Sequence, residues 1–402
     1  EQNMVKLRRV AGNALRSNPF LAGHYFCALV DSDFNGVGLL NNFREFKPGV
    51  VDLQADLTAP VRWCLFAEPA SIFSGGKVKL EALLSNFDTL RAGEYPVRIQ
   101  VIAPDGNRIL DEKITLDIPD PKTSGEAPLV REVFSREVPV SGPAGNYKFM
   151  VSFERGAVAT GGEITFHVFD PAAMPPVERE VVLWGNDPAL AQWLTKEGIR
   201  FRAFDGQPPS QRELILVGTG GGDLAAFRDL AQRMARGSTA VFLSPAVFAR
   251  GDQPLGFLPL ASKGALAGLN DVVGGYYRGD TFALLHPVFD GLPAGGVLDY
   301  TLYRNILPQS GLGLAGAPVP DDLIVAGIRA QLGYASLVQM AAFNFGEGRF
   351  VFNTLRIREN LGTDPVADIL LRNLLNDASE NLDKPLAEVP ADLDQQLKAI
   401  GY

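Results

Sequence analysis

The chain has 402 residues, of which 46% are hydrophobic and 21% charged, a globular composition long enough for about two to four domains. Its formal net charge of −9 argues against binding to a nucleic-acid backbone, which requires a basic surface. No apolar run reaches the roughly 18 residues of a membrane helix, so no membrane span is expected. Cys27 and Cys64 lie in apolar runs outside any Cys-x-x-Cys pair, which favours buried thiols over a disulfide or a zinc site.

The first fifty residues predict a helix, one buried strand, a polar loop and a short helix. The helical pattern covers residues 4–16 and ends at Asn18-Pro19. The apolar run 25–30 predicts a fully buried strand, and the polar residues 31–36 that follow predict a loop. Residues 39–46 predict the short helix. Because one parallel strand cannot bury itself, the rest of its sheet is expected elsewhere.

Residues 50–70 predict a connector with a strand-like centre at 61–66, and from Val78 onward the hydrophobic pattern takes the period of two that is typical of half-buried strands. Pro104-Asp105-Gly106-Asn107 marks a hairpin turn between two of these strands. We expect the strands to cover residues 61–66, 78–84, 95–102, 108–118, 129–138, 146–153 and 162–168. Their number and spacing predict an immunoglobulin-like β-sandwich over residues 51–170.

Residues 171–178 form a linker, which opens with the sequence PAAMPP, and strands then alternate with helices. Three helices are expected to begin after aspartates, which are favoured N-caps: Asp187, Asp223 and Asp364. Strands are expected at 180–184, 199–204, 213–217, 239–243, 323–328, 337–343 and 349–353. The alternation predicts a doubly wound, flavodoxin-like α/β domain over residues 179–376, followed by a polar tail, 377–402, with one short helix.

Residues 18–48 resemble the last strand and helix of the (β/α)8 catalytic barrel in family 2-type glycoside hydrolases. The resemblance rests on Asn18-Pro19, Ala22-Gly23, Tyr25, Asp31, Asn35-Gly36, Leu39-Leu40, Arg44 and Lys47-Pro48. The sequence departs from the pattern at His24, where an aromatic residue is usual, and in the spacing of Gly36-Val37-Gly38. Residues 1–50 therefore resemble the C-terminal end of that barrel. The two later domains resemble, more weakly, accessory domains of the same enzymes, including a glutamine-amidotransferase-like α/β domain.

The resemblance implies a retaining β-glycosidase, in which one glutamate is the general acid/base and a second is the nucleophile. In this family both stand at the ends of the fourth and seventh barrel strands, so both are expected upstream of residue 1, and this chain alone is expected to be inactive. The chain would complete the barrel and the rim that binds substrate.

Barrel active sites lie at the carboxyl ends of the strands, which places the loop after residue 30 at the rim. Asp31, Asp33 and Asn35 could hydrogen-bond sugar hydroxyls, and Phe34 could stack on a sugar ring. The alternative is that Asp31 and Asp33 cap the next helix and close an Asx turn.

The resemblance also implies partners: a carbohydrate substrate, and either the N-terminal half of the same enzyme or a companion chain. The orphan strand and the amphipathic helix 5–15, which has no local sheet to cover, support an obligate partner. Neither nucleic acid, a membrane span, a metal nor a cofactor is expected, and homo-oligomerisation is left open. The residues indicate no compartment, whereas the resemblance favours a periplasmic or secreted location.

The expected α/β domain carries no recognised catalytic motif. The sequence GTGGGD, residues 218–223, fits neither a dinucleotide fingerprint nor a P-loop, and favours a tight strand-to-helix turn. Ser244 follows a strand but lacks the Gly-x-Ser-x-Gly elbow, and no cysteine is available there. His286 is expected to be a structural hydrogen-bonder, and His24 and His167 to be core or sheet-face residues. This domain is therefore expected to be non-catalytic.

A different class of function is a non-enzymatic carbohydrate-binding or assembly module, built from the sandwich and the α/β domain. A sugar-binding sandwich would expose tryptophan or tyrosine, whereas Trp63, Trp184 and Trp193 fall within expected strands or a helix. A third alternative makes the α/β domain an independent enzyme, for which the sequence offers no nucleophile, metal cluster or phosphate loop.

Overall fold

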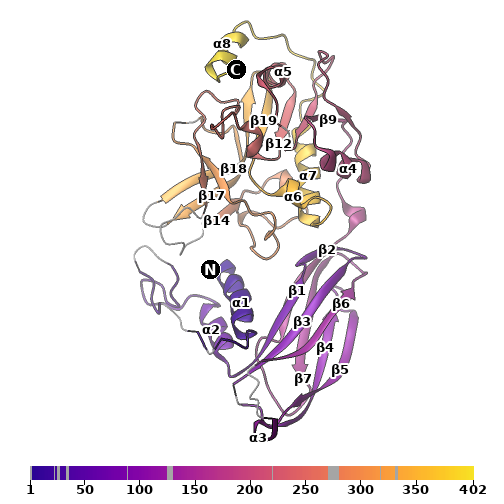
Figure 1. The fold of residues 1–402 in the computed structure, drawn as a ribbon, viewed down its shortest axis with the longest axis vertical. Helices are drawn as coiled ribbons and strands as arrows, with labels where there is room; N and C mark the ends of the chain where they lie inside the picture. Colours follow the sequence, from indigo (N-terminus) through magenta and orange to yellow (C-terminus); the bar gives the residue numbers. More distant parts are fainter. Residues whose placement is uncertain are drawn as a thin grey trace. The chain divides into compact units, whose positions relative to one another are not determined.

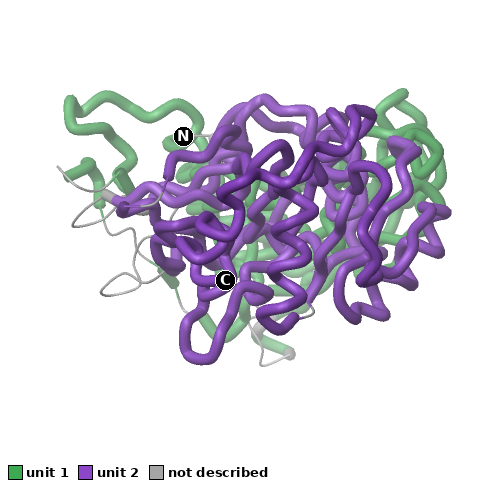
Figure 2. The backbone as a smooth tube through the Cα atoms, turned by 90° about the horizontal axis from the view of Figure 1, so that it is seen from above, with its two compact units in different colours: residues 1–173, 299–302 green, residues 174–298, 303–402 purple. Residues whose placement is uncertain are grey.

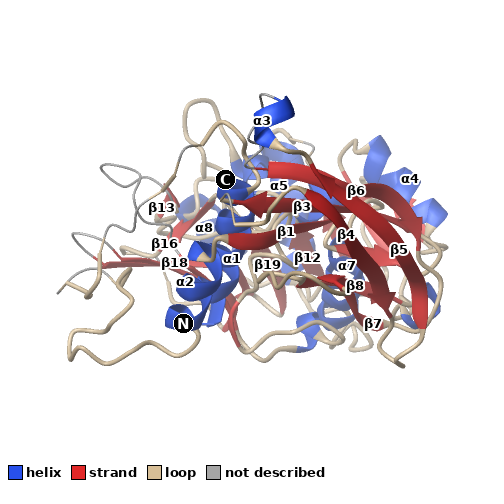
Figure 3. Ribbon diagram, turned by 90° about the horizontal axis from the view of Figure 1, so that it is seen from below, coloured by secondary structure: helices blue, strands red, loops and turns tan. Residues whose placement is uncertain are grey.

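A computed structural model describes residues 2–21, 23–24, 28–32, 36–87, 89–124, 130–219, 221–269, 280–316, 318–330 and 334–402. The chain divides into two compact units (Figure 2). Unit 1 comprises residues 1–173 and 299–302, and unit 2 comprises residues 174–298 and 303–402. Helices accompany several β-sheets (Figure 3), so the expectation of a mixed α/β and β protein is confirmed at that level.

The strands of unit 1 (Figure 1) form two sheets. The two sheets share one apolar core. The first sheet has the order β1-β3-β6 and the second β2-β8-β7-β4-β5, and neighbours are antiparallel except β2 and β8. The elements are α1 Gln2–Arg16, α2 Val50–Thr58, β1 Val61–Glu68, β2 Ser71–Phe73, β3 Lys77–Asn86, β4 Gly93–Ile102, β5 Arg108–Ile118, α3 Pro121–Ser124, β6 Val130–Pro139, β7 Gly145–Phe153 and β8 Glu163–Phe169.

Alternation explains how the two sheets pack. Every second residue of β3 and β4 is buried in the shared core, namely Val78, Leu80, Ala82 and Leu84, and Val97, Ile99 and Val101. Trp63 of β1 packs on Phe153 of β7 with ring centroids 4.9 Å apart, joining the two sheets. The seven expected strands are confirmed: the apolar centre 61–66 is β1, and the six strands expected from the period of two are β3 to β8. Alternation predicts strands because successive side chains point to opposite faces, so that only one face is buried.

The beginning of unit 1 differs from expectation. Residues 25–27 lie outside the described part, and residues 28–30 form a single bridge, Val30 to Leu40, rather than a strand. The short helix expected at 39–46 is wrong: the segment is a turn, in which Asn41 Oδ1 accepts from the backbone N–H groups of Phe43 and Glu45. Arg44 has a left-handed φ of 64°, which is incompatible with a helix interior. Helix α2 stands where a connector was expected.

Unit 2 is built on one mixed sheet, with eleven strands among the described residues. Its path is β10-β9-β11-β12-β19-β18-β17-β14-β15, while β16 pairs with β13 and β18. The short helix η1 Pro171–Ala173 ends the first stretch of unit 1. The elements of unit 2 are β9 Val181–Trp184, α4 Pro188–Lys196, β10 Phe201–Ala203, β11 Leu214–Val217, α5 Leu224–Ala235, β12 Thr239–Phe242, η2 Pro245–Phe248, β13 Ala265–Gly268, β14 Asp280–Ala283, η3 Pro287–Phe289, β15 Gly296–Val297, β16 Ser310–Gly313, β17 Asp322–Ala330, β18 Tyr334–Phe345, β19 Gly348–Asn353, α6 Ile357–Asn360, α7 Pro365–Ala378 and α8 Leu393–Ala399.

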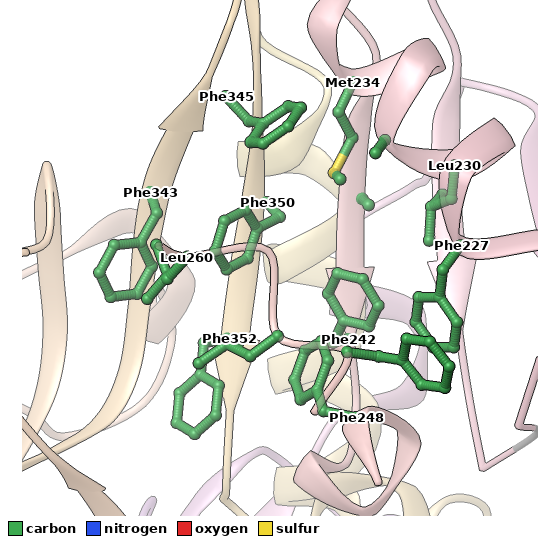
Figure 4. Packing of buried hydrophobic residues seen from close by; sticks show 14 of the residues in the cluster. Phe227, Leu230, Met234, Phe242, Phe248, Leu260, Phe343, Phe345, Phe350 and Phe352 are labelled. Carbon is green, nitrogen blue, oxygen red and sulfur yellow. The ribbon is translucent and has the colours of Figure 1, made fainter. Parts of the chain in front are cut away.

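The first five strands of this path are parallel, and the remaining neighbours are antiparallel. Strand residues of one parity pack with α5 and α8 in a phenylalanine-rich cluster, part of which Figure 4 shows. There Phe343 and Phe350 stack with centroids 5.2 Å apart. The buried side chains of α7 do not belong to that cluster, and α7 lies against β12 on the other face. Helices thus cover both faces of the parallel part, as its nearly continuous apolar strands require.

The short helix expected in the polar tail 377–402 is confirmed as α8, but the tail from Leu393 onward is part of the core of unit 2. Leu393, Leu397 and Ile400 of the α8 region are buried in the phenylalanine-rich cluster. Tyr402 is buried there too, and its hydroxyl donates to the Phe257 carbonyl. Three apolar side chains at helical spacing, together with Tyr402 beyond the helix, are buried despite the polar residues between them.

Replacing Tyr402 with phenylalanine is expected to lower the free energy of unfolding by about 1–2 kcal/mol, because the buried Phe257 carbonyl loses its donor. Urea unfolding would measure the change. The matched control is Tyr95→Phe, whose hydroxyl bonds the exposed Arg91 carbonyl at 3.0 Å and should matter less. Equal effects of the two substitutions would contradict a buried role for Tyr402.

Candidate functional site

Asp31 lies in a loop that side chains hold together. Its Oδ1 atom accepts hydrogen bonds from the backbone N–H of Gly38 and from Lys47 Nζ, both at 2.7 Å. The same Lys47 ammonium donates to the Gly36 carbonyl at 2.7 Å. Arg8 of α1 donates to the Val37 carbonyl. We call Arg8, Asp31 and Lys47 the loop clasp, because together they bind three consecutive residues, 36–38.

The structure describes one of the four residues that the sequence predicted for substrate contact. Asp33, Phe34 and Asn35 lie outside the described residues, between Asp31 and the clasped residues in the chain. Sequence reasoning missed Lys47 and Arg8 as members of this site. Lys47 did appear in the family pattern, but its partners are 16 and 11 residues away, and nothing local in the sequence indicates such pairing.

Helix α1 turns its polar side inward. Gly12, Asn13 and Arg16 are buried, whereas Leu7, Val10 and Leu15 are exposed to 37%, 50% and 39%. Gly12 faces Leu57 of α2 so closely that a Cβ atom there would overlap its side chain. A surface helix normally buries its apolar stripe. The arrangement of α1 is the reverse of that rule.

Arg62 joins α1, α2 and the sandwich. Its side chain is only 1% exposed, donates to Asn13 Oδ1 at 2.7 Å and pairs with Asp56 at 3.0 Å. Asn13 in turn donates to the Leu65 carbonyl at 2.7 Å, and Arg16 donates to the Ser85 hydroxyl at 3.1 Å. Sequence reasoning missed this network, although a lone arginine inside the apolar run Val61–Phe66 was a visible signal of a buried charge.

Apolar side chains are exposed over the same region of unit 1. Phe20, Leu29, Phe43 and Phe46 are exposed to 93%, 64%, 85% and 73%. Sixteen large hydrophobic side chains are exposed among the described residues, and eight of them lie between residues 7 and 46, about a tenth of the chain. Single exposed apolar residues are ordinary, so the unusual feature is that eight of them fall in this one stretch of the chain.

In unit 2 the carboxyl edge of the parallel strands is occupied by a structural ion pair. Asp187, the N-cap of α4, pairs with Arg358 through both carboxylate oxygens and also accepts from the backbone N–H groups of Leu190 and Thr219. Burial disfavours its ionised form, but the bonds from Arg358 and the backbone outweigh burial and lower the pKa of Asp187. The carboxylate is thus committed to structure.

Gly218 is required by this arrangement, because a Cβ atom at that position would overlap the Asp187 carboxylate. Gly218→Ala is therefore expected to destabilise the protein by about 2 kcal/mol or more. Gly221→Ala, three residues away, meets no atom within 4 Å and should be neutral or slightly stabilising. Thermal unfolding of the two variants would check this, and an unchanged melting temperature for Gly218→Ala would contradict the close approach.

The remaining candidate groups of the α/β unit serve structure as well. Ser244 caps η2 by accepting from the Ala246 N–H. His286 Nδ1 accepts from the Val288 N–H at 3.2 Å, so its Nε2 carries the hydrogen that Asp322 accepts at 3.0 Å. This confirms the expectation of a structural hydrogen-bonder. The described residues contain no group of three or more His, Cys, Asp or Glu arranged to hold a metal ion.

Cys64 is a buried free thiol, as expected, and Cys27 lies outside the described residues. Burial raises the pKa of the Cys64 thiol, although Arg62 and Arg16 oppose the shift. A thiol with a raised pKa and no exposure is a poor nucleophile. Over the described stretches, no helix is both long and apolar enough to cross a membrane.

The chain matches no protein-family model and no curated protein. Among solved structures it has weak similarity to the alkylpurine DNA glycosylase AlkC of Pseudomonas fluorescens bound to DNA with an abasic site analog (16% identity, 30% of this chain, 32% of that chain, TM-score 0.20). A second weak similarity is to a CARDB domain of Pyrococcus furiosus in complex with di-metal ions (13% identity, 27% of this chain, 86% of that chain, TM-score 0.20). A third is to a β-glucosidase of Erythrobacter marinus (15% identity, 27% of this chain, 16% of that chain, TM-score 0.19). The chain thus spans about a third of the first structure and a sixth of the last. Similarity at these TM-scores carries no argument about its fold or activity.

Proposed function

We propose that this chain is the C-terminal portion of a retaining β-glycoside hydrolase similar to family 2. It would complete the catalytic barrel and contribute Asp31, Asp33, Phe34 and Asn35 to the rim, while the two catalytic glutamates come from upstream of residue 1. The parent enzyme would cleave a β-glycosidic bond by double displacement through a glycosyl-enzyme intermediate. The inverted helix α1 is the observation that carries the proposal.

An exposed apolar stripe costs free energy in water unless a partner covers it. The stripe of α1, Leu7, Val10 and Leu15, is held outward because Asn13 and Arg16 are bonded to the sandwich. A helix anchored in this way cannot rotate to bury the stripe within unit 1. The occupant that we propose is the remainder of the (β/α)8 barrel, because residues 18–48 resemble its last strand and helix.

The exposed phenylalanines of the following segment fit the same occupant. Phe43 and Phe46 lie on a turn that Asn41 closes by accepting from two backbone N–H groups, so their exposure belongs to an ordered loop. Covering Phe20 and Leu29 as well would bury side chains worth about 1.5–3 kcal/mol each. Such a gain supports an obligate partner, either preceding these residues in one polypeptide or held in a companion chain.

The later domains would be accessory. Two sheets around one core are consistent with an immunoglobulin-like sandwich over 51–170, and the parallel order β10-β9-β11-β12-β19 is consistent with a flavodoxin-like domain over 179–376. We propose that the α/β domain is non-catalytic, since Asp187, Ser244 and His286 are all committed to structure. From the family resemblance we also propose a periplasmic or secreted location. Homo-oligomerisation is left open.

A carbohydrate-binding module is the competing function. Such modules commonly present exposed tryptophan rings, but Trp63, Trp184 and Trp193 are 1%, 3% and 5% exposed. Every tryptophan of the chain is therefore buried, and the competing function lacks a tryptophan platform.

The test uses the polypeptide or complex that carries these residues in its source. We expect it to hydrolyse an aryl β-glycoside, with retention of anomeric configuration by proton NMR. Val10→Asp should abolish activity by blocking burial of the α1 stripe, whereas Val158→Asp, at a position 88% exposed on the sandwich, should leave it intact. Absence of hydrolysis across a panel of aryl β-glycosides would refute the proposal, and so would full activity of Val10→Asp.

A further inference from the structure

The loop clasp buries its charges. The side chain of Lys47 is 6% exposed and that of Asp31 is 12% exposed. An ammonium group has three donors and no acceptor, and burying it is costly unless it is paired. Lys47 meets this requirement with the Asp31 carboxylate and the Gly36 carbonyl, both at 2.7 Å. A buried pair of this kind indicates a place where the chain must be held in one geometry.

The clasp closes on a backbone that could not accept a larger residue. A Cβ atom at Gly38 would lie 2.5 Å from the backbone nitrogen of Asp31 and 2.8 Å from the Leu40 carbonyl oxygen. The backbone at Gly38 therefore lies directly against the backbone of Asp31. The Gly38 N–H donates the hydrogen bond that Asp31 Oδ1 accepts. Side chains from positions 8, 31 and 47 thus fix residues 37, 38 and 36 respectively against the rest of unit 1.

The clasp is continuous with the anchor of α1. Arg8, which holds Val37, stands on the same helix as Asn13 and Arg16, the residues that bond α1 to the sandwich. One helix, α1, is therefore bonded both to the sandwich and to the segment 36–38. Positions 33–35 are bounded in sequence by Asp31 on one side and by the clasped residues on the other.

We infer that Asp31 is a positioning residue that acts with Lys47 and Arg8, and that it is not itself a sugar ligand. This inference rests on the proposed function and deepens it. Asp31 Oδ1 already accepts from two donors, so a sugar hydroxyl would compete with an ammonium group for it. The role of the clasp is to hold the backbone of residues 36–38 in one geometry against Asp31, Lys47 and Arg8.

The first measurement is hydrogen exchange at residues 36–40, which does not depend on activity. Lys47→Met and Asp31→Asn should each speed exchange in this segment by about tenfold, the equivalent of one lost hydrogen bond. The double variant should be no faster than the more affected single variant, because both substitutions open one clasp. Arg44→Met, which removes an exposed cation from the same loop, is the matched control and should leave exchange unchanged. Unchanged exchange in both clasp variants would overturn the inference.

The second measurement is kinetic and uses the intact hydrolase. A positioning role predicts that Lys47→Met and Asp31→Asn reduce kcat/KM by similar factors, about 10- to 100-fold, and that the double variant is no worse. Direct sugar contact by Asp31 predicts instead that Asp31→Asn reduces kcat/KM more than Lys47→Met does, and that the factors of the two single variants multiply in the double variant. That result would overturn the inference. A wild-type protein that hydrolyses no glycoside, yet shows the expected exchange, would refute the proposed function while leaving the clasp itself intact.

Discussion

Replacing Arg62 with methionine is expected to lower the free energy of unfolding of unit 1 by about 3–5 kcal/mol. Methionine fills a similar volume but leaves Asp56 and Asn13 without the donor that now serves both. Because Asn13 anchors α1 and Asp56 belongs to α2, amide exchange should accelerate in both helices before the strands of the sandwich respond. Urea unfolding gives the magnitude, and hydrogen exchange resolved by peptide gives the location.

Two variants make this expectation specific. Arg62→Met combined with Asp56→Asn should recover part of the loss, since no uncompensated carboxylate is then left behind. Lys77 forms an ion pair with Glu137, and the two side chains are 67% and 69% exposed. Lys77→Met removes the cation of this pair and should not measurably change the free energy of unfolding. The buried role of Arg62 would be contradicted if Arg62→Met were no more destabilising than Lys77→Met.

Replacing Asp368 with asparagine is expected to stabilise unit 2 at pH 8 by about 1–3 kcal/mol and to leave stability at pH 4 unchanged. Burial raises the pKa of Asp368 to about 6 from an ordinary 3.8, although bonds from Gly362 and Trp193 oppose the shift. The folded protein therefore holds this proton more tightly than the unfolded chain does. Stability contributed by protonated Asp368 is complete below about pH 4 and is lost as the pH rises through about 6.

Asparagine keeps the acceptor while removing the titration. Asp368 Oδ1 accepts from Trp193 Nε1 and from the Gly362 N–H, both at 2.8 Å, and an amide oxygen can accept both bonds. Asp368→Ala loses both bonds and should be less stable at every pH. Chemical unfolding between pH 4 and pH 8 would compare them, with Asp394→Asn as the control, since that side chain is 84% exposed. Parallel pH profiles for wild type and Asp368→Asn would rule out the proposed titration.

The helix starts and most strands could be predicted because their causes are local. Asp187, Asp223 and Asp364 each accept a hydrogen bond from a backbone N–H in the first turn of the following helix, as their positions before α4, α5 and α7 predicted. Six β-strands of unit 1, β3 to β8, followed from alternation, which depends on residues two apart. The short strands β13 to β16 have only two to four residues each and carry too little pattern to be seen.

The candidate site was predicted only in part. Asp31 was singled out for its place after an apolar run, but its neighbours Lys47 and Arg8 are 16 and 23 positions away and come from a turn and a helix. Helix α1 was correctly expected to be amphipathic, yet its orientation could not be derived, because it depends on Arg62 and Leu65 in the sandwich. The tail was misjudged for the same reason, since the core that covers Leu397 is assembled from distant segments.

The sequence by itself therefore determined the pattern of most of the strands, the helix caps, the linker and the mixed α/β and β composition of the fold. These properties arise from contacts between residues at most four apart. Only the tertiary structure decided which charges are buried, which face of α1 is turned outward and which backbone groups the loop clasp holds. Those outcomes depend on pairs such as Arg62 with Asn13 and Asp187 with Arg358, 49 and 171 residues apart, which become neighbours only when the chain has folded.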